Sequence, residues 1–166
     1  MNFEKQSTHL VWRAGMTFDA TTTTGHHLVL DALPPGGNDR GPKPIELMLT
    51  ALAGCTAMDV LSILSKMREP VLDLTVDVEG IRATRHPMIY TDIEIVYRVR
   101  GDVNPPAMER AIELSVTKYC GAHAMLEQSA HITTRFEIEP HENPSQESAY
   151  GPDQVLEVEH VAPSLP

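Results

Sequence analysis

The chain has 166 residues, a length typical of one domain, and 42% of them are apolar, which is enough to build a hydrophobic core. Its formal net charge of -10 argues against a nucleic-acid partner, because proteins that follow phosphate backbones present a basic face. No basic amphipathic stretch indicates binding to a membrane surface. The first residues lack the basic and apolar segments of a signal peptide, so we expect a cytoplasmic protein whose two cysteines are reduced.

The first third of the chain predicts short strands over 9–12, 16–22 and 26–31, with a tight turn at 13–15. A loop rich in proline and glycine follows and ends at Pro44, a residue well suited to the first position of a helix. Apolar residues at three- and four-residue steps then predict a helix from 45 to about 67.

Small residues occupy the middle of this predicted helix, at positions 53, 54, 55 and 57. Because small side chains let another backbone come close, we expect the helix at the centre of the fold. Glu46 and Asp59 interrupt its apolar stretch, which favours a buried helix over a membrane span.

Two longer alternating strands and a second helical region complete the pattern. Strands are predicted over 71–81 and 89–99, a helix over 107–119, a helical turn over 123–128 and a last strand over 131–138. The order predicts an α+β fold with helices packed on antiparallel strands, in one domain over 1–139. The composition changes to a Pro- and Glu-rich tail over 140–166, in which alternation at 155–159 predicts a possible extra strand on a partner subunit.

The two cysteines are the candidate reactive groups. Free cysteine often serves only as a small buried apolar residue. Cys55, however, lies in the narrow middle of the predicted helix, where a larger apolar residue would fill a core better. Cys120 follows Lys118 and precedes His123, and a nearby cation favours the reactive thiolate, although a helix C-terminus opposes it. The spacing of the two cysteines does not decide whether they are buried apolar residues or reactive thiols.

A family resemblance adds to these observations. The segment Pro44–Val60, which contains Ala-Gly-Cys-Thr-Ala-Met-Asp-Val, resembles the first cysteine motif of the OsmC/Ohr superfamily, and Lys118-Tyr119-Cys120 resembles the second. The similarity of strand and helix order covers about 8–139. The amino-acid sequences of both motifs are most similar to those of the YhfA-like branch of that superfamily.

The resemblance implies antiparallel sheets wrapped around two central helices, in an interwoven homodimer with active sites at the subunit boundary. It also implies a thiol peroxidase that reduces organic hydroperoxides in oxidative stress defence. Cys55 would form a sulfenic acid, Cys120 would resolve it to a disulfide, and a dithiol reductant would reopen that bond.

The sequence departs from the peroxidase pattern at the groups that activate the first thiol. The peroxidases hold an activating arginine with a glutamate ten residues before the first cysteine, where this chain has Ile45. Glu46 is the candidate substitute, but nine residues is about two and a half turns of an ideal helix, so Glu46 would point away from Cys55. Its alternative role is to interact with the positive end of the helix dipole. The arginine position aligns with Met16, and Arg13 and Arg40 are the candidate substitutes, with Arg40 in the loop before the helix.

Asp59 lies four residues after Cys55, on the same helix face. A carboxylate there would raise the thiol pKa, so Asp59 is either a hydrogen-bond acceptor or the holder of an activating cation. The eight histidines suggest no metal site, and no cofactor-binding motif is present. Two functions stay open: an enzyme using Cys55, Cys120, Arg40 and Glu46, or a non-catalytic dimeric binding or redox-sensing protein.

Overall fold

A first, N-terminal sheet contains three short antiparallel strands. The computed structural model describes residues 3–140, in which β1 (Thr8–Ala14), β2 (Thr17–Thr22) and β3 (His27–Leu30) form a sheet in the order β1-β2-β3. The turn between β1 and β2 contains Gly15 at a φ of 54°, a conformation that glycine adopts without strain. All three predicted strands are confirmed to within a few residues.

The second sheet is larger and carries the helices. It contains β4 (Val71–Arg82), β5 (Tyr90–Gly101) and β6 (His131–Glu139) in that order. The helical elements are α1 (Glu46–Met67), α2 (Pro105–Leu114), the π-helical turn η1 (Ser115–Tyr119) and α3 (Gly121–Leu126). These elements confirm the predicted order and the α+β class. The predicted tail, with its possible strand at 155–159, lies outside the described residues.

Two details differ from the prediction. The expected helix over 107–119 changes to π-helical geometry in its last five residues. The expectation of purely antiparallel sheets is wrong for one pair, because β6 runs parallel to β5. The physical reason is the connection: α2, η1 and α3 carry the chain back to the end of the sheet where β5 began, so the next strand runs in the same direction.

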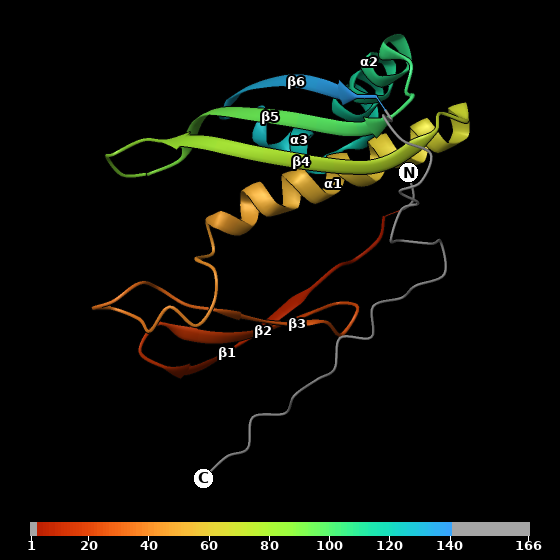
Figure 1. The fold of residues 1–166 in the computed structure, drawn as a ribbon. Helices are drawn as coiled ribbons and strands as arrows, with labels where there is room; N and C mark the ends of the chain where they lie inside the picture. The colour runs from red at the N-terminus through yellow and green to blue at the C-terminus, as the bar shows by residue number, and fades with distance from the viewer. Residues whose placement is uncertain (1–2, 141–166) are drawn as a thin grey trace.

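Helix α1 lies between the two sheets (Figure 1). One stripe of its side chains, at Leu52, Thr56, Val60 and Leu64, is buried in the main core with inward residues of β4 and β5. Its other face carries exposed apolar side chains, among them Met48, Met58 and Leu61. The strands of the first sheet contact one another extensively but have few contacts with the other elements, and β1 is exposed along its whole length.

By length and composition, α1 could also cross a membrane. The core helix of a globular protein passes the same test, and the buried stripe of α1 against β4 fits that second description. The sequence-based preference for a core helix over a membrane span is consistent with this packing.

Gly80 allows the first half of α1 to pack closely on the second sheet. A Cβ atom at this position would lie 2.6 Å from the ring of Tyr90 and 3.2 Å from Leu49 of α1. The ring of Tyr90 is buried, and its hydroxyl donates to the carbonyl of Ile45 just before α1, so it has little room to move.

We therefore expect Gly80→Ala to lower the free energy of unfolding by about 1–3 kcal/mol, as overpacking does in other cores. Chemical denaturation followed by circular dichroism measures this change. Gly36→Ala is the matched control, because a Cβ there would meet only one carbonyl oxygen at 3.9 Å. Equal stability of the Gly80 variant and the wild type would contradict the close approach.

Candidate active site

Cys55 lies at the edge of the buried stripe of α1. It follows the buried Leu52 by three residues and directly precedes the buried Thr56, and its own side chain is partly exposed. Its side chain packs against the main core, while Met58, on the other face of the helix, is exposed. The thiol therefore sits at a boundary between the core and the uncovered face of α1.

Cys120 reaches the same place from the other helical region. It ends η1, where its N–H donates to the carbonyl of Ser115 across five residues, and it directly precedes α3. Its sulfur accepts a hydrogen bond from the N–H of His123 at 3.3 Å. The thiol is only 3% exposed, so the turn of η1 holds it inside the protein.

The two thiols meet beside a carboxylate. Cys55 Sγ, Cys120 Sγ and a carboxylate oxygen of Asp59 all lie within 4.8 Å of one another. The structure thus brings together two of the four predicted site residues, and adds Asp59. A disulfide has a sulfur–sulfur bond of about 2 Å, so the two thiols can be joined by modest side-chain movement rather than by refolding.

The surroundings keep Cys120 protonated. Burial raises the pKa of the Cys120 thiol to about 12, helped by a side-chain hydrogen bond with Cys55 and by the negative charge of Asp59. The N–H of His123 acts in the opposite direction, because it stabilises the thiolate. Cys120 is therefore a thiol at neutral pH.

A chain of buried hydroxyl groups runs from the second sheet to Asp59. Tyr97 Oη and Thr56 Oγ1 are 2.5 Å apart, Thr56 Oγ1 and Ser115 Oγ are 3.0 Å apart, and Ser115 Oγ donates to Asp59 Oδ2 at 3.1 Å. Tyr97, Thr56 and Ser115 are fully buried. These hydrogen bonds join β5, α1 and η1 beside the two thiols.

The direction of these hydrogen bonds follows from counting protons. Each hydroxyl has one proton to donate, and the proton of Ser115 goes to the carboxylate. Thr56 must then donate to Ser115, and Tyr97 must donate to Thr56. Burial raises the pKa of Tyr97 to about 12, against the opposing effect of Thr56, so Tyr97 keeps its proton. Each hydroxyl of this hydrogen-bonded series therefore donates toward Asp59.

The structure does not bring the other two predicted site residues to the thiols of the same chain. Glu46 lies at the start of α1, where its carboxylate accepts from the N–H of Lys43 and pairs with the Lys43 ammonium group at 2.8 Å. Nine residues of helix separate it from Cys55 by about 13 Å along the axis. The side chain of Arg40 is exposed, and its backbone N–H donates to Asp31.

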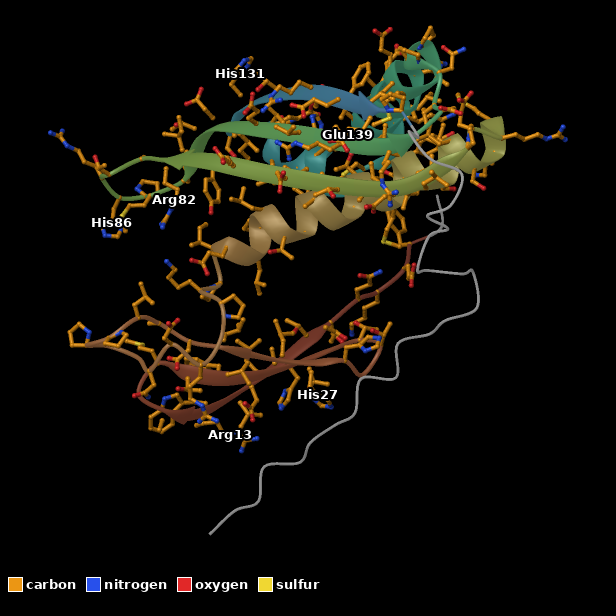
Figure 2. The ribbon with its side chains drawn as sticks, viewed as in Figure 1. Arg13, His27, Arg82, His86, His131 and Glu139 are labelled. Carbon is orange, nitrogen blue, oxygen red and sulfur yellow. The ribbon has the colours of Figure 1, made fainter. Side chains whose placement is uncertain are left out.

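The arginine at Arg13 is also engaged elsewhere, in an ion pair with Asp19 on the first sheet. Figure 2 shows its side chain on the side of that sheet that faces away from α1. Among the described residues 3–140, no ion pair or hydrogen bond joins an arginine side chain to Cys55, Asp59 or Cys120.

Three histidines lie in separate parts of the structure: His27 on β3, His131 on β6 and His86 in the loop between β4 and β5. They point to different sides of the molecule (Figure 2). His123 is buried beside Cys120, with its Nδ1 3.6 Å from a Glu127 carboxylate oxygen, and this nitrogen has no hydrogen-bond partner within the described part of the chain.

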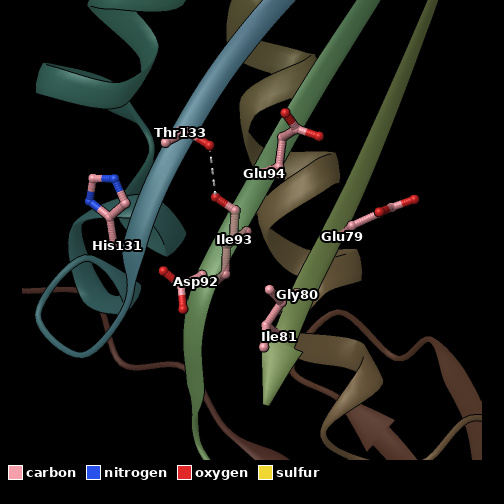
Figure 3. A pocket seen from close by; sticks show the side chains of 8 residues that line it. All are labelled: Glu79, Gly80, Ile81, Asp92, Ile93, Glu94, His131 and Thr133. Atoms are coloured by element: carbon pink, nitrogen blue, oxygen red, sulfur yellow. Dashed lines mark hydrogen bonds between the residues drawn. The ribbon is translucent and has the colours of Figure 1, made fainter. Parts of the chain in front are cut away.

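A separate hollow lies on the second sheet near the start of β6. It has a volume of about 360 Å³ and is lined by Glu79, Asp92, Glu94, His131 and their neighbours, with side chains from β4, β5 and β6 (Figure 3). Glu94 already pairs with Arg135, and the hollow contains no thiol. The chemistry of the chain therefore centres on Cys55, Cys120 and Asp59.

Comparison with known proteins agrees with this geometry. Residues 36–135, which include both cysteines, match the family model described as OsmC-like protein. The chain belongs to the OsmC-like family. It is 37% identical to Protein YhfA of Escherichia coli over 128 residues, which make up 76% of this chain and 93% of the relative.

Solved structures share this fold. A hypothetical protein from Aquifex aeolicus has a TM-score of 0.76 and 33% identity, with 84% of this chain and all of that chain covered. An organic hydroperoxide resistance protein OsmC from Legionella pneumophila has a TM-score of 0.63 and 15% identity, over 82% of this chain and 99% of that one. The second similarity shows the fold alone.

The sequence analysis missed three members of this OsmC-like site: Thr56, Tyr97 and Ser115. A signal for two of them was present. Thr56 is a polar residue in the apolar stripe of α1, and Tyr97 lies at an inward position of an alternating strand, where a buried hydroxyl needs a partner. Ser115 had no such signal, because its contact depends on how η1 packs against α1.

The hydroxyl chain also contributes to stability. We expect Tyr97→Phe to lower the free energy of unfolding by about 1–2 kcal/mol, because Thr56 loses its buried donor. Tyr119→Phe is the matched control: Tyr119 is exposed, so its change should stay below about 0.5 kcal/mol. Denaturant titration of the two variants measures the difference, and equal losses would contradict the assigned chain.

Proposed function

We propose that this OsmC-like protein is a thiol-dependent peroxidase that reduces organic hydroperoxides through Cys55 and Cys120. The observation that carries the proposal is the meeting of the two thiols, which lie 65 positions apart in the sequence and within 4.8 Å of each other in the fold. Family membership supports the same chemistry, because a relative of the same fold is named an organic hydroperoxide resistance protein.

The two thiols divide the work by their exposure. Cys55 is the more accessible, so it meets the hydroperoxide, and its sulfur attacks one peroxide oxygen. The O–O bond breaks, Cys55 becomes a sulfenic acid, and the other oxygen takes a proton and leaves as the alcohol. The buried Cys120 then attacks the Cys55 sulfur; the S–S bond forms, the S–O bond breaks, and water leaves.

Asp59 suits the second step. Cys120 is a protonated thiol in the resting protein and must lose its proton as the disulfide forms. A carboxylate oxygen of Asp59 lies within 4.8 Å of both sulfurs, and the carboxylate is held by Ser115. We assign to it the role of accepting that proton and passing it to the departing oxygen. A dithiol reductant then reduces the disulfide by two exchange steps, and we assign this cycle to a reducing compartment such as the cytoplasm.

We further propose that the active unit is an interwoven homodimer. Two apolar surfaces of the single chain are uncovered: the outer face of α1, where Met58 is 74% exposed, and the first sheet, where Trp12 is 63% exposed. Uncovered apolar surfaces on this scale indicate a protein interface. Pairing the first sheet of one subunit with α1 of the other covers both and closes the boundary at which Cys55 sits.

The dimer proposal is tested by mass in solution. Wild-type protein should sediment as a dimer, and Met58→Glu should weaken that dimer by at least tenfold, because a carboxylate would be buried in the interface. Thr75→Glu is the matched control, since Thr75 is exposed on the opposite face of β4. A wild-type monomer, or equal effects of both variants, would contradict the proposed interface.

The peroxidase proposal is tested by counting thiols. Reduced, metal-free protein treated with one equivalent of cumene hydroperoxide should lose both of its free thiols, and its intact mass should fall by two hydrogens. Cys120→Ser should stop at a sulfenic acid on Cys55 that dimedone traps, while Cys55→Ser should keep its thiol. Wild-type thiols that survive the hydroperoxide would overturn the proposal.

One observation favours a second function. Within residues 3–140 no arginine side chain is bonded to the thiols, whereas the family's peroxidases activate the first cysteine with one. A non-catalytic redox sensor would use the same disulfide without rapid turnover. Steady consumption of hydroperoxide with excess dithiol distinguishes the two: the enzyme turns over many times per chain, while the sensor oxidises slowly and once.

A further inference from the structure

The same cluster has the composition of a metal site. Two cysteines and one aspartate supply three potential ligand atoms, Cys55 Sγ, Cys120 Sγ and an Asp59 carboxylate oxygen, all within 4.8 Å of one another. We propose that these three residues bind a thiophilic divalent cation, Zn²⁺, in the reduced protein. Among the described residues, the three ligand atoms come from Cys55, Asp59 and Cys120 alone, and no histidine nitrogen belongs to the group.

The first reason is charge. All three side chains become anions when they ionise, and they converge where Cys120 is almost completely buried. Grouping such ligands away from water is unfavourable unless the thiols stay protonated or a cation neutralises them. Among the described residues, the hydrogen-bond partners of the cluster are the neutral Ser115 hydroxyl and the His123 N–H, so no positive side chain fills that role.

The second reason is ligand chemistry and shape. Thiolates favour zinc over the harder Mg²⁺ and Ca²⁺, which prefer oxygen ligands. In a tetrahedral site with Zn–S bonds of about 2.3 Å, the two sulfurs lie about 3.8 Å apart. The present spacing needs to close by no more than about 1 Å, which side-chain rotation supplies. Since Cys55 is partly exposed, a fourth position stays open to water or another small ligand.

The third reason is the support of the carboxylate. Residues that bind metals are usually oriented by hydrogen bonds from a second layer of residues. Here Ser115 donates to Asp59 Oδ2 and is itself held by Thr56 and Tyr97, so the carboxylate is fixed before any cation arrives. The other carboxylate oxygen remains available for the metal. An isolated surface aspartate would lack this buried arrangement.

Zinc binding and disulfide formation exclude each other. Binding takes both cysteines as thiolates and releases their protons, and a sulfur bound to zinc cannot at the same time form the Cys55–Cys120 bond. The metal site does not depend on peroxidase activity, because a protein that never reacts with hydroperoxide could still bind the cation.

The test uses full-length protein, reduced with a phosphine and freed of metal by a chelator. Zinc titrated against a chromogenic competitor should bind with one ion per chain. Cobalt should give a thiolate-to-metal charge-transfer band in the near ultraviolet and tetrahedral bands in the visible. Cys55→Ser, Cys120→Ser and Asp59→Asn should each weaken zinc binding at least tenfold, and Ser115→Ala about tenfold, through the loss of support for the carboxylate.

Two features keep the test decisive. Asp59→Asn retains the shape and an oxygen that can accept from Ser115, so near-ultraviolet circular dichroism should confirm that it still folds. Glu127→Gln is the matched control, because Glu127 lies beside His123 but outside the cluster, and its affinity should equal that of the wild type. Undiminished zinc affinity in Asp59→Asn and Cys55→Ser, or a cobalt spectrum without a thiolate band, would overturn the proposal. Neither result bears on thiol consumption by hydroperoxide.

Discussion

The buried hydrogen bond from Thr56 to Ser115 is the contact on which the site depends. It joins α1, which carries Cys55, to η1, which directly precedes Cys120; β4, β5 and α2 lie between these two segments in the sequence. Tyr97 donates into this contact from the sheet, and Ser115 passes the last hydrogen bond to Asp59. Because Tyr97, Thr56 and Ser115 are fully buried and must find their hydrogen-bond partners within the protein, the helices can approach only in the register that satisfies all four side chains. That register sets Cys55 beside Cys120.

The site combines two properties that oppose each other. Attack on a hydroperoxide needs an anionic sulfur, a role that we assign to Cys55, but its immediate neighbours are a carboxylate and the buried Cys120, whose surroundings favour the neutral thiol. Three sources of positive charge would resolve the conflict: a partner subunit in the proposed dimer, a bound cation, or the proton that Cys120 keeps. They differ in which sulfur can still react. A guanidinium from the partner subunit would leave both sulfurs reactive, a bound cation would block both, and the proton would block only the buried Cys120.

Most of the fold could be predicted from the sequence, because local patterns determine it. Alternation along β4 and β5 and the apolar repeat of α1 fixed these elements to within one or two residues. The parallel direction of β6 could not be read in this way, since it depends on where the helical connection ends. In the site, both cysteines and Asp59 could be identified from the sequence, whereas their proximity could not, because it depends on how η1 packs against α1. Glu46 and Arg40 were assigned by analogy, and their contacts within the chain are with Lys43 and Asp31.

The π-helical turn has a consequence for how this chain can vary. Its hydrogen bond from Cys120 N–H to the Ser115 carbonyl spans five residues, where an α-helix would span four. The turn thus accommodates one residue more than regular helix needs between the hydroxyl that holds Asp59 and the second thiol. Deleting a single residue here would restore an ordinary helix and rotate Cys120 by about 100° around its axis. The spacing of Ser115 and Cys120 is therefore intolerant of length change, although the three residues directly before Cys120, which are Thr117, Lys118 and Tyr119, are exposed and take no part in the buried hydrogen bonds.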